Sequence, residues 1–79
     1  MDNRNKEVIA TFSTHYGAML TKRELGDRCT LRPVPRVLSS SCGTCAVVRD
    51  SSVEEIKNTA GEYLEGVFEL VDERYVNIL

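Results

Sequence analysis

Apolar residues of this chain gather in four short segments of strand length, alternating most clearly at residues 8–12, and recur at the helical spacing of about 3.6 residues in two others. The segments follow each other as strand, helix, strand, strand, helix and strand. A chain of 79 residues buries only about 60% of the surface that its unfolded form exposes, so it supports a single core. We therefore expect one domain over residues 7–71, with residues 1–6 and 72–79 as terminal extensions.

The predicted strands are short and are separated by residues that disfavour pairing. In the first strand, Val8, Ala10 and Phe12 alternate with residues that point to the opposite face. Pro33 and Pro35 lack backbone donors and end the second strand, and a loop rich in Ser and Gly follows. We predict strands at residues 8–13, 29–34, 45–49 and 67–71, with the loop at residues 37–43.

The first predicted helix begins where Ser13 or Thr14 offers an N-cap oxygen and ends near Gly26. Its apolar stripe is expected to face the core. That stripe consists of Tyr16, Met19 and Leu20.

The second predicted helix carries a stronger start signal. Ser52 and Glu55 have the spacing of a capping box, in which each side chain satisfies a backbone N–H of the other residue. An apolar stripe lies opposite a charged face, and Gly66 is the expected end. The stripe consists of Val53, Ile56, Ala60, Tyr63 and Leu64.

The order of these elements predicts an α+β protein of the ferredoxin-like βαββαβ type. Two split βαβ units then form one antiparallel four-stranded sheet with two helices on one face. In the tail, Val76, Ile78 and Leu79 could add a strand edge or a subunit contact, so a homodimer is one expectation. Because this fold hosts many unrelated functions, the function has to be argued from a site.

The overall charge argues against a polyanion partner. The chain has ten basic and twelve acidic side chains, whereas nucleic-acid-binding domains carry a basic surplus. No apolar run approaches the roughly 20 residues of a membrane span, and the N-terminus lacks the apolar core of a secretory signal. Three cysteines cannot close a full disulfide framework. We expect a cytoplasmic protein with reduced thiols and without a nucleic-acid or membrane partner.

The predicted chain direction brings Cys42 to a helix start. The first helix and the loop between the second and third strands begin at the same end of the sheet, and Thr14 and His15 stand there. Free N–H groups and roughly half a positive charge at a helix start favour an anion. A thiol beside them and beside basic side chains such as Arg36 is expected to have a lowered pKa and to react as the thiolate.

The remaining loop residues and cysteines are assigned by their positions. Gly43 permits a positive φ, and Ser40 and Ser41 could hydrogen-bond an anionic sulfur. Cys45 begins an apolar strand, where packing or chemistry explains it equally well. Cys29 alternates with Leu31 and is expected to be a small core residue.

The C-x-x-C spacing of Cys42 and Cys45 allows three interpretations. A thioredoxin-type dithiol places the motif at a helix start, whereas here the second cysteine leads into a strand. A zinc site needs four ligands, so with His15 it would have to bridge two subunits, and we expect no metal. In the third interpretation, a reactive cysteine on a mobile loop accepts a terminal sulfur or selenium atom and passes it on by thiol exchange.

Three stretches of the chain resemble the selenium/sulfur carrier-like family of small bacterial proteins. They are VIATFS with the following TH (residues 8–15), PVPRVLSSSCG (residues 33–43) and GVFEL (residues 66–70). The resemblance spans about residues 7–71, and its distinctive part runs from Pro35 to Gly43. Members of the family more often have an aliphatic or small residue where Cys45 stands.

The resemblance implies that Cys42 carries the chalcogen as a persulfide or selenopersulfide, with no other cofactor, and that the protein acts beside selenium or sulfur metabolism. It implies a loop made of Pro35, Arg36, Ser40, Ser41 and Gly43. We then expect a donor such as a cysteine desulfurase and a downstream sulfur- or selenium-using enzyme as partners, with the chain a carrier more than a turnover enzyme. His15, the first helix's N–H groups and Arg36 would hold the persulfide anion, and Cys45 would be a resolving or auxiliary thiol.

Two alternatives remain open. One is a thiol–disulfide redox protein, which requires both Cys42 and Cys45. The other is a non-catalytic interaction module that pairs through its sheet edge or its apolar tail.

Overall fold

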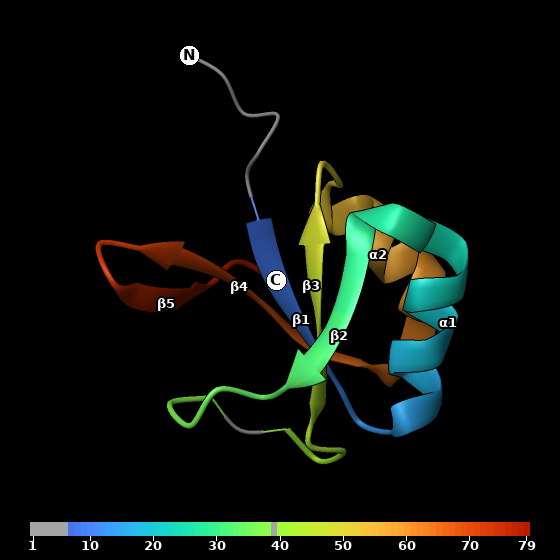
Figure 1. Ribbon diagram of the computed structural model, residues 1–79, viewed down its shortest axis with the longest axis horizontal. Coiled ribbons are helices and arrows are strands. Elements are labelled where there is room, and N and C mark those ends of the chain that lie inside the picture. The colour runs from blue at the N-terminus through green and yellow to red at the C-terminus, as the bar shows by residue number, and fades with distance from the viewer. Residues whose placement is uncertain (1–6, 39) are drawn as a thin grey trace.

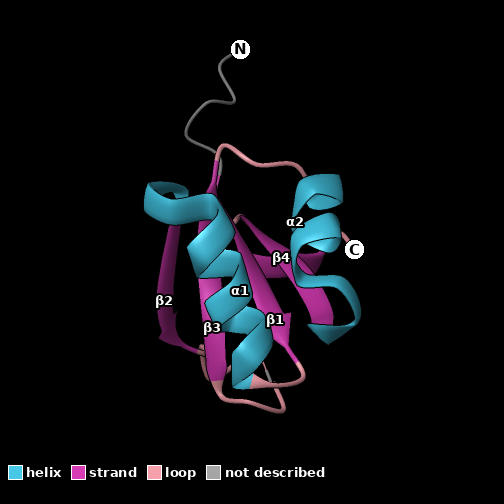
Figure 2. Cartoon of the chain, turned by 90° about the vertical axis from the view of Figure 1, so that its right-hand side faces the viewer, coloured by secondary structure: helices cyan, strands magenta, loops and turns pink. Residues whose placement is uncertain are grey.

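A five-stranded antiparallel sheet carries both helices on one face, as Figures 1 and 2 show. The computed structural model describes residues 7–38 and 40–79, so the predicted extension at residues 1–6 lies outside the described residues. The elements are β1 (Glu7–Phe12), α1 (His15–Leu25), β2 (Cys29–Pro33), β3 (Thr44–Arg49), α2 (Val53–Ala60), β4 (Leu64–Val71) and β5 (Arg74–Asn77). A 3-10 turn follows each helix, at Gly26–Arg28 and Gly61–Tyr63.

The first six elements follow the predicted order, but the sheet has five strands and not four. The strand order is β2-β3-β1-β4-β5, and the part of the chain predicted as a terminal tail supplies β5. Asp72 and Glu73 both have positive φ angles, of 50° and 66°, as a tight hairpin turn with the twist of its strands requires. This turn folds Arg74 back onto Val71 and extends the sheet by one edge strand. Figure 1 shows the β4–β5 hairpin reaching away from the helices.

The core lies between the sheet and the helices. Val8, Ala10 and Phe12 of β1 are buried there, as their alternation predicts, because successive strand residues point to opposite faces. Ala18, Ile56 and Ala60 cover them from the helix side. Neither helix in the described part of the chain is both long and apolar enough to cross a membrane.

The predicted core stripe of α1 is wrong for two of its three residues. Tyr16 is 56% exposed and Met19 is 54% exposed, while the buried face of the helix consists of Gly17, Ala18, Thr21 and Leu25. The physical reason is the close approach of α1 to its neighbours. A Cβ atom added at Gly17 would lie only 2.5 Å from the Cβ of Tyr63, so this face requires small residues.

The second helix starts as predicted but ends earlier. The backbone N–H of Glu55 donates to the Ser52 hydroxyl at 3.0 Å, which confirms the N-cap. The helix ends at Ala60, because Gly61 takes a φ of 59° and closes it. Gly66 is therefore not the helix end, and it lies inside β4 opposite Thr11.

Candidate functional site

Residues 34–38 and 40–43 of the loop between β2 and β3 lie at the same end of the sheet as the start of α1 (Figure 2), and residue 39 of the predicted loop lies outside the described residues. The Ser40 hydroxyl donates to the carbonyl oxygen of Phe12, the last residue of β1, at 2.8 Å. Two residues later the chain enters α1 at Thr14, the N-cap residue. The predicted proximity of the loop to the helix start is thus found in the structure. The Thr14 side chain, however, makes no capping hydrogen bond, so the expected cap oxygen is not used.

Cys42 sits in a tight turn in which its sulfur contacts the backbone of Thr44. The thiol can donate to the Thr44 carbonyl oxygen at 3.2 Å, and the Thr44 backbone N–H donates to the sulfur at 3.4 Å. Gly43 between them has a φ of 75°, a conformation that favours glycine. The Ser40 oxygen lies 3.8 Å from the sulfur. The side chain is half-buried and packs against the edge of the core.

The Cys42 turn is anchored to the body of the protein. The Ser41 hydroxyl donates to one carboxylate oxygen of Glu65 at 2.7 Å, and the Ser41 backbone N–H donates to the other at 3.2 Å. These bonds hold the pKa of the Glu65 carboxyl below its usual value. At the base of the loop, the Val34 N–H donates to the Gly43 carbonyl oxygen. Sequence reasoning missed Glu65, because the chain there was predicted to be helical and no motif marks the residue.

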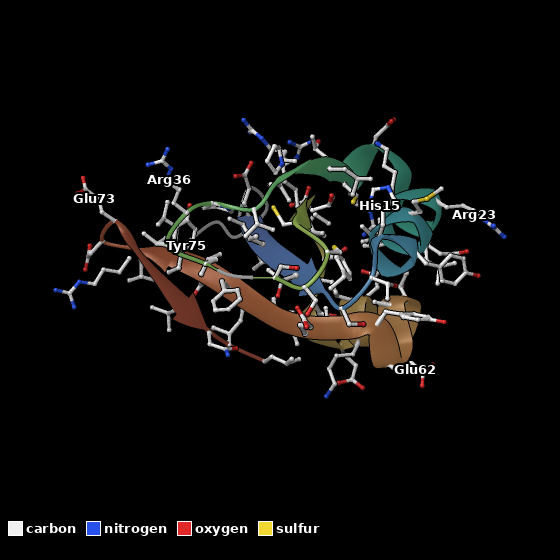
Figure 3. The ribbon with its side chains drawn as sticks, turned by 90° about the horizontal axis from the view of Figure 1, so that it is seen from below. His15, Arg23, Arg36, Glu62, Glu73 and Tyr75 are labelled. Carbon is white, nitrogen blue, oxygen red and sulfur yellow. The ribbon has the colours of Figure 1, made fainter. Side chains whose placement is uncertain are left out.

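The other predicted thiolate-stabilising residues lie around this end without contacting the Cys42 sulfur. Within residues 7–38 and 40–79, none of Thr14, His15 and Arg36 forms a hydrogen bond with that atom. His15 and Arg36 are both exposed, and Figure 3 shows them far apart across this end of the molecule. Ser41 uses its single hydroxyl proton on Glu65. The atoms that do approach the sulfur come from Ser40 and Thr44.

Cys45 faces away from the core that Cys42 contacts. It pairs with Thr11 and precedes Ala46, which belongs to the core on the helix side, so Cys45 points to the other face of the sheet. There it lines a cavity of about 310 Å³ together with Ile9 and Val47.

Burial gives Cys45 a different environment from Cys42. Cys45 is only 1% exposed, and this burial raises the pKa of its thiol. The Arg32 guanidinium opposes the increase, whereas the Cys42 thiol adds to it. All three cysteines are free thiols. The two thiols of the C-x-x-C motif therefore open to opposite faces of the sheet.

The third cysteine is a core residue, as predicted. Cys29 is 1% exposed within the hydrophobic core, and burial raises the pKa of its thiol, partly offset by the Lys22 ammonium. In the described portion of the chain, no group of three His, Cys, Asp or Glu side chains is placed to hold a metal ion.

Comparison with known proteins identifies the family of the chain. Searches of curated proteins and of solved structures found no match. A family model described as "Putative Se/S carrier protein-like" matches residues 7–69, which include the Cys42 turn, Glu65 and both helices. The chain therefore belongs to the Se/S carrier-like family.

Proposed function

We propose that this protein holds sulfur or selenium as a persulfide or selenopersulfide on Cys42 and delivers it to an acceptor enzyme. The observation that carries the proposal is that the family model for Se/S carrier-like proteins matches residues 7–69, a range that includes Cys42. Cys42 is the one cysteine of the three that is not fully buried, and it lies in the turn that leads into β3. Thiol exchange requires a sulfur that another molecule can reach.

Loading of Cys42 is an exchange without net oxidation. The Cys42 thiolate attacks the terminal sulfur of a donor persulfide, so that a new S–S bond forms as the donor S–S bond breaks. The donor cysteine leaves as a thiolate and takes up the proton that Cys42 lost. An acceptor thiolate then removes the terminal sulfur in the same way, and Cys42 leaves as the thiolate. Selenium follows the same scheme.

The backbone around Cys42 fits both states of the sulfur. In the resting thiol, the proton donates to the Thr44 carbonyl oxygen. The Thr44 N–H points at the sulfur and would continue to donate to it in the persulfide, because this bond needs no proton on sulfur. The bond is strongest in the attacking thiolate, where the Cys42 sulfur itself carries the charge, because hydrogen bonds to an ionised acceptor are stronger than those between neutral groups. In this proposal the Thr44 backbone holds the Cys42 sulfur, a role first expected of His15 and Arg36.

A carrier of this kind needs no enclosed substrate pocket, since the reacting atom arrives and leaves bound to partner proteins. The partners we propose are a donor such as a cysteine desulfurase and a downstream enzyme that uses sulfur or selenium. The thiol–disulfide alternative fits less well, because Cys45 is buried and opens to the opposite face.

The test is mass spectrometry of the intact protein after incubation with a cysteine desulfurase and either cysteine or selenocysteine. We expect the mass to increase by one chalcogen atom, mapped to Cys42 in the peptide digest. Cys42→Ser should abolish the addition, and Cys45→Ser should leave it intact. A protein that gains no chalcogen, or gains it equally in Cys42→Ser, contradicts the carrier function. Loss of the addition in Cys45→Ser would favour the redox alternative.

A further inference from the structure

The turn that holds Cys42 is fixed on both sides by side chains. On one side, the Ser40 hydroxyl donates to the Phe12 carbonyl oxygen of β1. On the other, the hydroxyl and the backbone N–H of Ser41 both donate to the Glu65 carboxylate of β4. We call this second pair of bonds the Ser41–Glu65 latch. The 2.7 Å bond from the Ser41 hydroxyl has the length of a charge-assisted hydrogen bond, and the 3.2 Å bond from the backbone N–H is a longer, ordinary one.

The latch acts on the residue next to the reactive sulfur. Ser41 directly precedes Cys42, and its backbone N–H is one of the two latch donors, so the latch fixes main-chain as well as side-chain position. With the latch closed, the Cys42 side chain packs against the core and its thiol can donate back to Thr44. Glu65 of β4 therefore anchors the turn from a position 24 residues after Ser41 in the sequence.

We propose that Glu65 is a positioning residue for Cys42, and that the Ser41–Glu65 latch holds the sulfur in a sheltered position from which it must move out to meet a partner protein. Opening the latch releases Ser41 and lets the turn carry Cys42 away from the core. The fraction of molecules in which the Cys42 thiol is exposed is then set by the strength of the hydrogen bonds between Ser41 and the Glu65 carboxylate. The lowered pKa of the Glu65 carboxyl agrees with this arrangement, because the ionised form accepts both bonds.

The test measures the alkylation rate of Cys42 in the full chain at neutral pH, using small iodoacetamide and a bulky maleimide, with the modified residue identified by peptide mapping. Glu65→Ala removes both bonds and should accelerate reaction of Cys42 with the bulky reagent about fivefold. The reaction of Cys42 with iodoacetamide should accelerate less, because a small reagent already reaches the half-buried sulfur. Rates that are unchanged or slower in Glu65→Ala overturn the proposal.

Two further variants separate the latch from a simple change of charge. Ser41→Ala keeps the Glu65 charge and removes the shorter bond, so it should accelerate Cys42 in the same direction by a smaller factor. The double variant should react at about the same rate as Glu65→Ala, below the product of the two single effects, because both changes break the same latch. If the two single effects on the Cys42 alkylation rate multiply, or if Ser41→Ala leaves that rate unchanged, the acceleration in Glu65→Ala comes from the lost charge alone and not from the latch. Glu65→Gln, which retains one acceptor oxygen, should restore part of the wild-type rate.

Glu62→Ala is the matched control, since Glu62 is an exposed carboxylate in the preceding 3-10 turn (Figure 3) and should leave the Cys42 rate unchanged. Alkylation of the buried thiols Cys29 and Cys45 reports on global unfolding. If a variant accelerates their alkylation together with that of Cys42, the substitution has destabilised the whole fold and not only the latch. The inference rests on the proposed function for its purpose but not for its test. Alkylation reports the latch even if no chalcogen is ever loaded, and loading of Cys42 can succeed even if the latch variants react normally.

Discussion

Cys42, Cys45 and Cys29 occupy three different environments although they belong to one small domain. Cys42 is half-buried in a turn at the end of the sheet, whereas the other two are each 1% exposed. Burial disfavours the charged form of a thiol, and it raises the pKa of both Cys45 and Cys29. Because the thiolate is the nucleophile, these two residues combine poor access with a low reactive fraction at neutral pH.

We therefore expect iodoacetamide at pH 7 to modify Cys42 before the other two thiols, by about tenfold or more in rate. Raising the pH to 9 should increase the reaction of Cys45 and Cys29, as their thiols begin to ionise. Peptide mapping by mass spectrometry at short times measures the order directly. Modification of Cys45 ahead of Cys42 would remove the basis for assigning the carrier role to Cys42.

At the scale of the elements, the two helices begin in different ways. The Ser52 hydroxyl accepts the Glu55 N–H and caps α2, and two glutamates in the first turn complement the helix dipole. Thr14 occupies the equivalent position in α1, but its side chain makes no capping bond and the first turn contains no acidic residue. The start of α1, at the end of the sheet where Cys42 lies, is thus left without a side-chain cap.

This difference predicts unequal effects of the same substitution. Ser52→Ala should lower the free energy of unfolding by about 1 kcal/mol, the usual value of a lost N-cap. Thr14→Ala should change it by less than about 0.5 kcal/mol, as for a surface residue without a partner. Urea denaturation followed by circular dichroism measures both. Equal losses in the two variants would mean that Thr14 caps α1 in solution.

At the scale of the whole molecule, buried thiols lie on both faces of the sheet. Cys29 belongs to the core beneath the helices, and Cys45 lies on the face that carries no helix. Both have a pKa above that of an unfolded thiol, so the folded state favours their protonated forms. The stability that this contributes is fully present below the unfolded thiol pKa of about 8.5 and is lost as the pH rises through the higher folded values.

We accordingly expect the free energy of unfolding to fall between pH 8 and pH 10. The double variant Cys29→Ala, Cys45→Ala should show a shallower fall over the same range, although its stability at pH 7 is lower because of the deleted core atoms. Denaturation at several pH values provides the two slopes, and the contributions of Lys and Tyr cancel in the comparison. Equal slopes would mean that the two thiols do not couple to folding.

The predictions that the structure confirms depend on neighbours in the chain. Alternation placed Val8 and Ala10 in the core, and the spacing of Ser52 and Glu55 located the start of α2. Gly26 ended α1 with a φ of 58°, as its freedom from a Cβ predicts. Each of these signals depends on only a few neighbouring residues, so it can be recognised in the sequence before any tertiary contact is known.

The sequence by itself therefore determined the order of the first six elements and the family to which the chain belongs. Tertiary structure decided which face of α1 is buried, because the close approach of Tyr63 selects Gly17 over the larger Tyr16 and Met19. It also decided that Glu65 reaches Ser41 across 24 positions of sequence. Such contacts arise from the packing of distant segments, and no local periodicity encodes which polar side chains will meet there.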